Sequence, residues 1–150
     1  MAQGDITCFN EFKEDLGLEL HQLETDTFRL GLITNAVTPA ANTAEPRWGA
    51  GGSTNLSTNQ VTPGGNYTTG GPTIANNTYV ETSGTAAFDG DNVQILQNAS
   101  NPTNARWGIG YNDTNAGKEA VFFLDLGSVF DLSSGDLTIT WAAAGIFTLT

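Results

Sequence analysis

Apolar residues near the N-terminus recur with the period of an α-helix. Their spacing of three or four positions defines one apolar stripe: Phe9, Phe12, Leu16, Leu20 and Leu23. The pattern predicts a helix over about residues 8–24. Gly17 weakens its interior by roughly 1 kcal/mol relative to alanine, so this helix needs a surface to lie on. His21 falls within it, and we expect a solvated side chain, because no second histidine or cysteine lies nearby to share a metal ion.

Downstream of the predicted helix the hydrophobic period changes to two. Phe28, Leu30 and Leu32 alternate with their neighbours, which predicts a strand that ends near Pro39. The second half of the chain continues as short strands separated by turn residues: 78–82, 85–89, 93–97, 106–111, 119–126, 137–141 and 146–149. Residues 120–124 are continuously apolar, which is typical of a strand buried on both faces or at a subunit interface.

Residues 37–77 form a long polar stretch that contains four of the five prolines and three glycine pairs. A structureless segment of this length is unusual in a compact domain. We therefore expect one or two short edge strands within it, near residues 54–61. The remainder is expected to be an extended loop that packs against a neighbouring subunit.

Short strands at this spacing, with no helix between them, indicate an antiparallel arrangement. The predicted fold is mainly β, an antiparallel β-sandwich of the jelly-roll-like kind with one short N-terminal helix. The chain is expected to form a single domain, residues 1–150, in which the sandwich extends from about residue 27 to residue 150.

The chain is strongly acidic. It contains 16 acidic residues and five lysines and arginines, so its formal net charge is −11. Few cations are present to displace the counterions of a phosphate backbone, so we expect no nucleic-acid partner, and the charge favours a basic or neutral partner surface. The single cysteine, Cys8, allows no intrachain disulfide. The sequence contains neither an apolar run of membrane-spanning length nor a secretory signal at its start, which predicts synthesis in a cytoplasm and no membrane partner.

Reactive side chains are scarce. General acid–base and nucleophilic catalysis need a titratable group near the working pH and a second group that orients it. The chain has one histidine and one cysteine, and it lacks Ser/His/Asp, Cys/His and phosphate-loop motifs. Asp125 and Asp131 are the kind of carboxylate pair that a glycosidase uses, but in so acidic a chain we expect both to be solvated. We therefore expect no enzymatic activity, no catalytic residue, no metal site and no cofactor.

Two short motifs have competing interpretations. Residues 89–92, Asp-Gly-Asp-Asn, resemble the start of a calcium loop, but Ser100 occupies the position that requires glutamate. The flanking pattern favours a hairpin turn there. Arg-Trp-Gly occurs twice: Trp107 alternates with apolar residues and is predicted to lie in the core, whereas Trp48 lies in a Pro/Gly-rich loop, where a core and an exposed or interfacial position stay open. The candidate interface residues are all aromatic: Phe9, Phe12, Trp48 and Tyr67.

Several segments resemble a widespread group of small virion structural proteins of tailed bacteriophages. Members open with a short helix and a strand like residues 27–39. A Gly-Tyr-Thr-x-Gly-Gly element follows, which residues 66–71 match with asparagine in place of the first glycine. Further similar segments are residues 87–91, 105–114, 137–141 and 145–149, so the resemblance spans nearly the whole chain.

The resemblance implies a capsid decoration or cement protein that binds the outer surface of the head and stabilises contacts between capsomers. Its partner would be the major capsid protein, and it would form a homo-oligomer, with a trimer favoured at three-fold and quasi-three-fold positions. It would be made in the host cytoplasm and reside on the virion. Two alternatives stay open: a component of the tail or of the base of a head fibre, and a virion surface module that binds host glycan through Trp48 and the Asn/Thr-rich loops.

Overall fold

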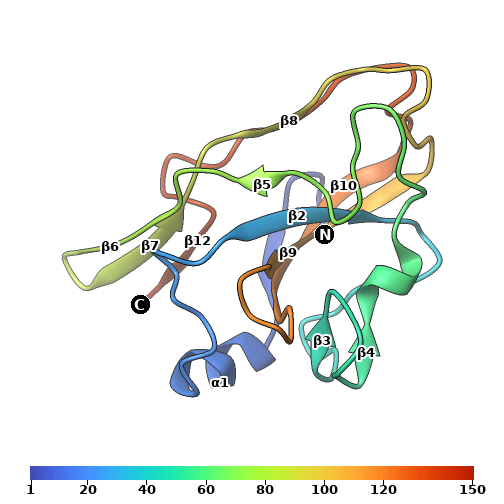
Figure 1. Cartoon of the computed structure of the whole chain (residues 1–150). Coiled ribbons are helices and arrows are strands. Elements are labelled where there is room, and N and C mark those ends of the chain that lie inside the picture. Colours follow the sequence, from blue (N-terminus) through green and yellow to red (C-terminus); the bar gives the residue numbers. More distant parts are fainter.

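The computed structural model describes residues 1–150 and shows a mainly β protein with one short N-terminal helix (Figure 1). Its largest sheet has five antiparallel strands in the order β1 (Ile6–Cys8), β10 (Ala120–Phe130), β9 (Ala105–Asn112), β2 (Phe28–Ile33) and β5 (Thr73–Ile74). The smaller antiparallel sheets are β12 (Phe147–Leu149) with β7 (Thr85–Asp89) and β6 (Thr78–Thr82), and β11 (Leu137–Ile139) with β8 (Val93–Ile95). The short strands β3 (Pro46–Arg47) and β4 (Thr54–Asn55) pair in parallel, and η1 (Leu56–Asn59) is a turn of 3-10 helix. The mainly β prediction is confirmed, no sheet closes on itself, and the jelly-roll arrangement stays a prediction.

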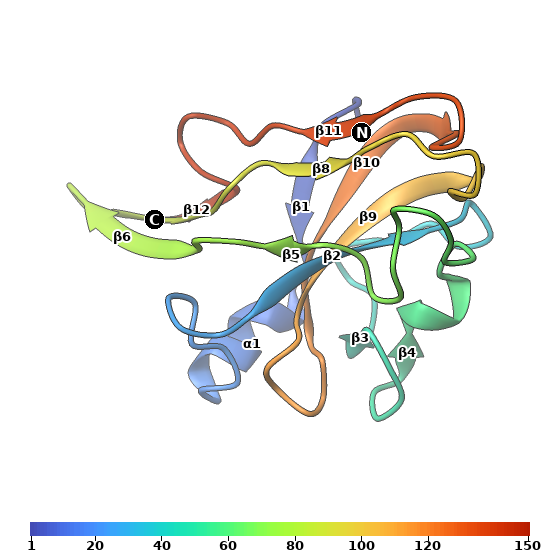
Figure 2. The same cartoon turned by 45° about the horizontal axis from the view of Figure 1, so that its top comes forward.

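Both faces of the five-stranded sheet are covered, as Figure 2 shows for β8, β11 and the β6–β7–β12 sheet on one side and for β3 and β4 on the other. Phe12 of helix α1 (Glu11–Gly17) packs into the core on the first side, against Phe147. Leu30 and Phe122 face the first side, where they pack with residues of the small sheets such as Phe88 and Phe147. Ile109 and Phe123 face the second side. This division follows from the alternation of side chains along a strand, which the sequence displays in β2 and β9.

The continuously apolar segment of β10 is buried on both faces. This confirms the first of the two predictions for it, a strand buried on both faces. A register shift against β9 leaves Val121 as an extra residue between Ala120 and Phe122. Such a bulge reverses which side chains face each side of the sheet. Ala120 and Phe123 therefore lie in one core while Phe122 lies in the other.

Glycines in the central strands make room for large rings on neighbouring strands. A Cβ atom on Gly110 of β9 would lie 2.2 Å from a ring carbon of Phe122, and one on Gly31 of β2 would lie 2.3 Å from the ring of Trp48. Both distances are far below van der Waals contact. The strands can thus pack their aromatic neighbours only because these two positions carry no side chain.

The N-terminal helix is shorter than predicted. Helix α1 spans Glu11–Gly17, whereas Cys8 belongs to β1 and residues 18–26 form turns. The helix ends at Gly17, and Glu19 has a left-handed backbone with φ of 59°, which a helix cannot continue through. The predicted apolar stripe is still mostly buried, but a series of turns rather than a long helix brings Leu23 into the core.

The prediction for His21 is wrong. Its side chain is fully buried, with its ring 5.3 Å from that of Phe12 and 6.3 Å from that of Phe28. The amide of Asn112, 91 residues away, reaches its Nδ1 atom at 3.3 Å. The local helical pattern does not indicate this burial, because it depends on how α1, β2 and the distant strand β9 come together in the fold.

Most of the polar stretch packs on its own chain, and its predicted packing on a neighbouring subunit stays a prediction. The N–H of Val61 donates to the carbonyl of Leu32 at 3.1 Å, and the carbonyl of Pro72 accepts from Leu30 at 2.9 Å. The segment thereby satisfies backbone groups along the outer edge of β2. Short strands do occur in it, as predicted, at β4 and β5.

The turn at residues 89–92 is not a hairpin, because β7 pairs with β6 and β12 while β8 pairs with β11. It is a connection between two sheets. Asn92 and Asp91 instead accept hydrogen bonds from the backbone N–H and the indole N–H of Trp141, at 3.0 and 2.8 Å. The predicted strands β6 and β7 have the expected bounds, and Trp107 is buried as predicted.

We expect Gly110→Ala to destabilise the fold by roughly 1–3 kcal/mol, because the fully buried Phe122 ring has no free space to move into. Gly135→Ala is the control, since its Cβ would meet nothing within 4 Å and its φ is not positive; it should change stability by less than about 0.5 kcal/mol. Urea denaturation followed by tryptophan fluorescence measures both. Equal stabilities for the two variants would contradict the packing described for β9 and β10.

Candidate functional site

A polar pocket of about 370 Å³ opens on the face of β2 that carries Arg29. The alternation of β2 places Arg29 and Gly31 on this face and the apolar Phe28 and Leu30 on the other. Besides Arg29, its lining comes from the loops around the sheet and from the end of β9: Trp48, Ser57, Gln60, Thr69, Gly70, Tyr111, Asp113 and Lys118. We call this site the polar pocket.

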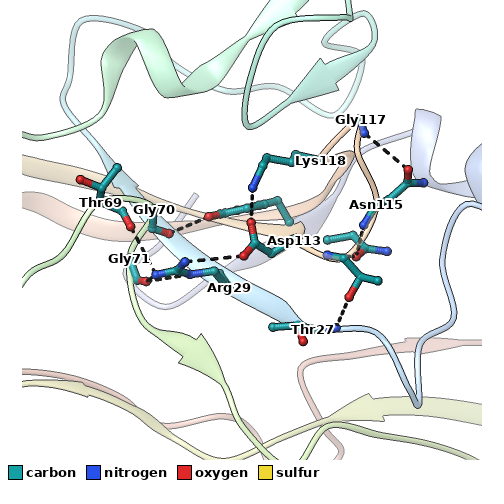
Figure 3. Close-up of polar contacts among 12 residues, drawn as sticks. Thr27, Arg29, Thr69, Gly70, Gly71, Asp113, Asn115, Gly117 and Lys118 are labelled. Atoms are coloured by element: carbon teal, nitrogen blue, oxygen red, sulfur yellow. Dashed lines mark hydrogen bonds and ion pairs between the residues drawn. The ribbon is translucent and has the colours of Figure 1, made fainter.

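Two cations in the polar pocket share one carboxylate (Figure 3). Arg29 Nη1 lies 3.6 Å from Asp113 Oδ2, and Lys118 Nζ is hydrogen-bonded to Asp113 Oδ1. Arg29 extends from β2 and Lys118 from the loop that precedes β10, so the shared carboxylate ties these elements together. The three side chains carry a formal charge of +1, in a chain whose net charge is −11. This local excess favours an anionic group on the open side of the pocket.

Arg29 also fixes the loop that contains Gly70 and Gly71. Its Nε donates to the carbonyl of Gly71 at 3.0 Å, and its Nη2 donates to that of Thr69 at 3.3 Å. Gly70 and Gly71 have φ of 83° and 79°, and a Cβ on Gly71 would lie 2.0 Å from the carbonyl oxygen of Leu30. Both the backbone conformation and the close approach therefore require glycine at residue 71.

Trp48 and Tyr111 stack beside the pocket, with ring centroids 5.0 Å apart and planes within 9°. The Tyr111 hydroxyl donates to the carbonyl of Gly70 at 2.9 Å, and burial is the main cause that raises its pKa. Trp48 is only 5% exposed and its backbone N–H donates to the carbonyl of Lys118. Trp48 could have been in the core or in an exposed or interfacial position, and the structure places its side chain in the core.

The four candidate interface residues are all buried within this chain. Phe9 packs against Phe123 and Phe12 against Phe147, with ring centroids 5.1 and 5.2 Å apart. The Tyr67 hydroxyl is also buried and accepts the backbone N–H of Leu32 at 2.8 Å. Their packing within one chain accounts for these residues, and a contact with a partner stays a prediction.

Two further ion pairs are largely buried. Arg47 pairs with Glu119, and Arg106 pairs with Asp125. The hydrogen bond from Arg106 is the main cause that lowers the pKa of Asp125. Asp125 is only 2% exposed, so the prediction that this carboxylate is solvated is wrong. Asp131 is exposed, as expected, and Ser133 is the main cause of its lowered pKa. No sequence pattern indicates these ion pairs, because each joins segments that meet only in the folded sheet.

A buried polar cluster lies between α1 and the adjoining ends of β9 and β10. His21 Nε2 lies 3.8 Å from Asp15 Oδ2, and neither His21 Nε2 nor Glu119 Oε2 has a hydrogen-bond partner. Burial is the main cause that raises the pKa of Asp15 to about 6 and lowers that of His21 to about 4. The amide nitrogen of Asn112 lies 3.3 Å from His21 Nδ1. No group of three or more His, Cys, Asp and Glu side chains is placed to hold a metal ion.

No protein-family model, curated protein or solved structure matches this chain. Three segments on which the phage resemblance rests meet at the polar pocket, namely residues 27–39, 66–71 and 105–114. Their contacts give these segments a structural role in this chain. The single helix is too short and too polar to cross a membrane.

We expect Tyr67→Phe to lower the free energy of unfolding by about 1–3 kcal/mol, because it leaves the buried N–H of Leu32 without its acceptor. Tyr79→Phe in β6 is the control, because the Tyr79 hydroxyl makes no hydrogen bond and the Tyr79 side chain is only half-buried. Urea denaturation measures the difference. If both variants match the wild type, the Tyr67 hydroxyl does not hold residues 66–71 against β2.

We expect His21 to make the protein less stable in acid. A histidine whose pKa is lowered from 6.5 to about 4 stabilises the fold fully above pH 6.5, and this stabilisation is lost as the pH falls toward 4. His21→Gln removes this contribution. The stability difference between wild type and variant should therefore shift in favour of the variant as the pH falls from 6.5 to 4, by at most about 1.4 kcal/mol per pH unit. The comparison cancels the opposite effect of Asp15, whose raised pKa makes the fold lose stability as the pH rises from about 4 to 6. A difference that does not change with pH would contradict the buried neutral ring.

Proposed function

We propose that this chain is a capsid decoration or cement protein of a tailed bacteriophage. It binds the outer head surface, contacts the major capsid protein and stabilises contacts between capsomers. The observation that carries the proposal beyond the resemblance is that cations are held internally while carboxylates remain outside. Such a surface suits attachment to a neutral or basic protein surface.

Four of the five cationic side chains are held in ion pairs within the chain: Arg29, Arg47, Arg106 and Lys118. They involve three of the 16 acidic residues, Asp113, Glu119 and Asp125, so most carboxylates are left without a cationic partner. The net charge of −11 is therefore expressed mainly on the surface. Long-range attraction to a basic partner surface would speed association at low salt.

The nucleophilic side chains are likewise held in unreactive states. Burial raises the pKa of the Cys8 thiol to about 11, so it is protonated at neutral pH. His21 is enclosed and neutral. These features support a role in binding rather than in chemistry, and the proposal accordingly includes no catalytic residue and no cofactor.

The proposal also includes the finer architecture and the assembly. Packing of the small sheets against one face of the five-stranded sheet supports a jelly-roll-like sandwich. A trimer at the three-fold positions of the head would repeat one interface around each axis. The glycan-binding alternative has less support, because a sugar needs an exposed aromatic face and Trp48 is buried.

Quantitative densitometry of purified virions tests the proposal. A decoration protein occupies positions repeated over the whole head, so we expect hundreds of copies per particle, whereas a tail or fibre-base component would be present in tens or fewer. The major capsid protein band is the internal standard. A low copy number would overturn the decoration role and favour the tail or fibre-base alternative.

A further inference from the structure

An apolar groove of about 740 Å³ lies apart from the polar pocket, between the N-terminal segment and β11. These two segments lie close together in Figure 2. One wall is formed by residues 136–142, a continuous stretch that contains β11. The opposite wall is formed by residues 3–6, and the floor includes Leu124, Leu126 and Phe130 of β10. The groove therefore runs along β11.

The strands that border the groove are edges of their sheets. β11 pairs only with β8, and β1 pairs only with β10. On β1, Asp5 accepts from the N–H of Asp125 and Phe9 donates to the carbonyl of Val121. In an antiparallel ladder these bonds alternate, so the backbone groups of Ile6 between them point away from β10. Free edges of this kind pair readily with a further extended chain.

The charged side chains that line the groove are all acidic. Asp5, Asp125 and Asp136 contribute to its lining, and no lysine, arginine or histidine does. Arg106 neutralises Asp125. Asp5 and Asp136 accept only backbone N–H groups, from Ala2 and Gln97, so two carboxylates at the groove have no cationic partner.

We propose that this groove binds an extended segment of a partner protein, in which apolar residues alternate with lysine or arginine, as an added strand on β11. In an extended chain alternate side chains point to opposite faces. The apolar ones would lie on Ile6, Phe130 and Ile139, the half-buried apolar side chains of the lining, and the basic ones would reach Asp5 and Asp136. Backbone hydrogen bonds give such strand addition its affinity, and the alternate side chains give it specificity.

The partner is a different protein rather than a second copy of this chain. Four of the five cations of this chain are in internal ion pairs, which leaves Lys13 on α1. A second copy therefore has no extended segment with free basic residues to offer. That the partner is the capsid protein rests on the proposed function, whereas the preference of the groove for such a segment does not.

Peptide binding to the purified full chain tests the proposal. The probe is a fluorescein-labelled nine-residue peptide in which valine and lysine alternate, followed by fluorescence anisotropy at low salt. Asp5→Asn with Asp136→Asn keeps an acceptor oxygen for Ala2 and Gln97 but removes both charges. We expect this double variant to bind about two- to thirtyfold more weakly, the range for two exposed ion pairs. Glu14→Gln with Glu24→Gln, at two exposed acidic residues away from the groove, changes the net charge equally and should change affinity less than about twofold.

Two further peptides and one backbone measurement separate strand addition from simple charge attraction. Peptides with serine in place of valine, or glutamate in place of lysine, should bind at least tenfold more weakly. Amide hydrogen exchange should slow at Leu137–Ile139 when the valine–lysine peptide is bound, and should not change in β6 on the far sheet. Equal binding of the serine peptide, equal weakening by both double variants, or unchanged exchange in β11 would overturn the proposal.

Binding to phage heads that lack this protein separates this inference from the proposed function. If the wild-type chain does not bind heads but the peptide still protects β11, the proposed function fails and the groove proposal is supported. If the wild type and the Asp5→Asn, Asp136→Asn variant bind heads equally while the peptide does not bind, the groove proposal fails and the proposed function is unaffected. Unchanged urea midpoints confirm that the variants are folded.

Discussion

The close packing of aromatic rings onto glycines of the central sheet is the constraint on which the rest of the structure depends. Phe122 lies over Gly110 on one face, and Trp48 lies over Gly31 on the other. Because both contacts are far too close for any side chain at these positions, the two rings can cover the faces of the sheet only if both residues are glycine. The small sheets pack on the core that contains Phe122, and part of the long polar segment packs on the core that contains Trp48.

The polar groups of the interior follow from this arrangement. Once Trp48 and the loop of residues 66–71 are seated on the sheet, Arg29 meets Asp113 and the carbonyl of Gly71. Each group that loses water in the process gains a partner, as burial of a polar group requires. The exceptions are three buried atoms without a hydrogen-bond partner, namely His21 Nε2, Glu119 Oε2 and Arg47 Nε. In the cluster around His21 the pKa values of Asp15 and His21 are also strongly shifted.

The cationic side chains and the free strand edges lie in different parts of the molecule. The cations are mostly turned inward, into ion pairs that join loops to the sheet, while two carboxylates line a groove between the free edges of β1 and β11. An acidic exterior with one open groove suits a protein that works through contact with a larger surface. The glycine, threonine and asparagine of the loops serve mainly to fit them onto the sheet, as at Gly71.

The sequence alone determined the elements whose periodicity is local. Alternation in β2 and β9 and the turn residues between later strands predicted most strands, with β6 and β7 at their observed bounds. Only the tertiary structure determined the burial of His21 and the packing of the long polar segment and of the aromatic residues near it. Their surroundings are contributed by strands as many as 91 residues away, and no local pattern records a contact over such a separation. The end of α1 was missed for a related reason, since a stripe with helical spacing is buried equally well by turns when the sheet, rather than the helix, supplies the surface.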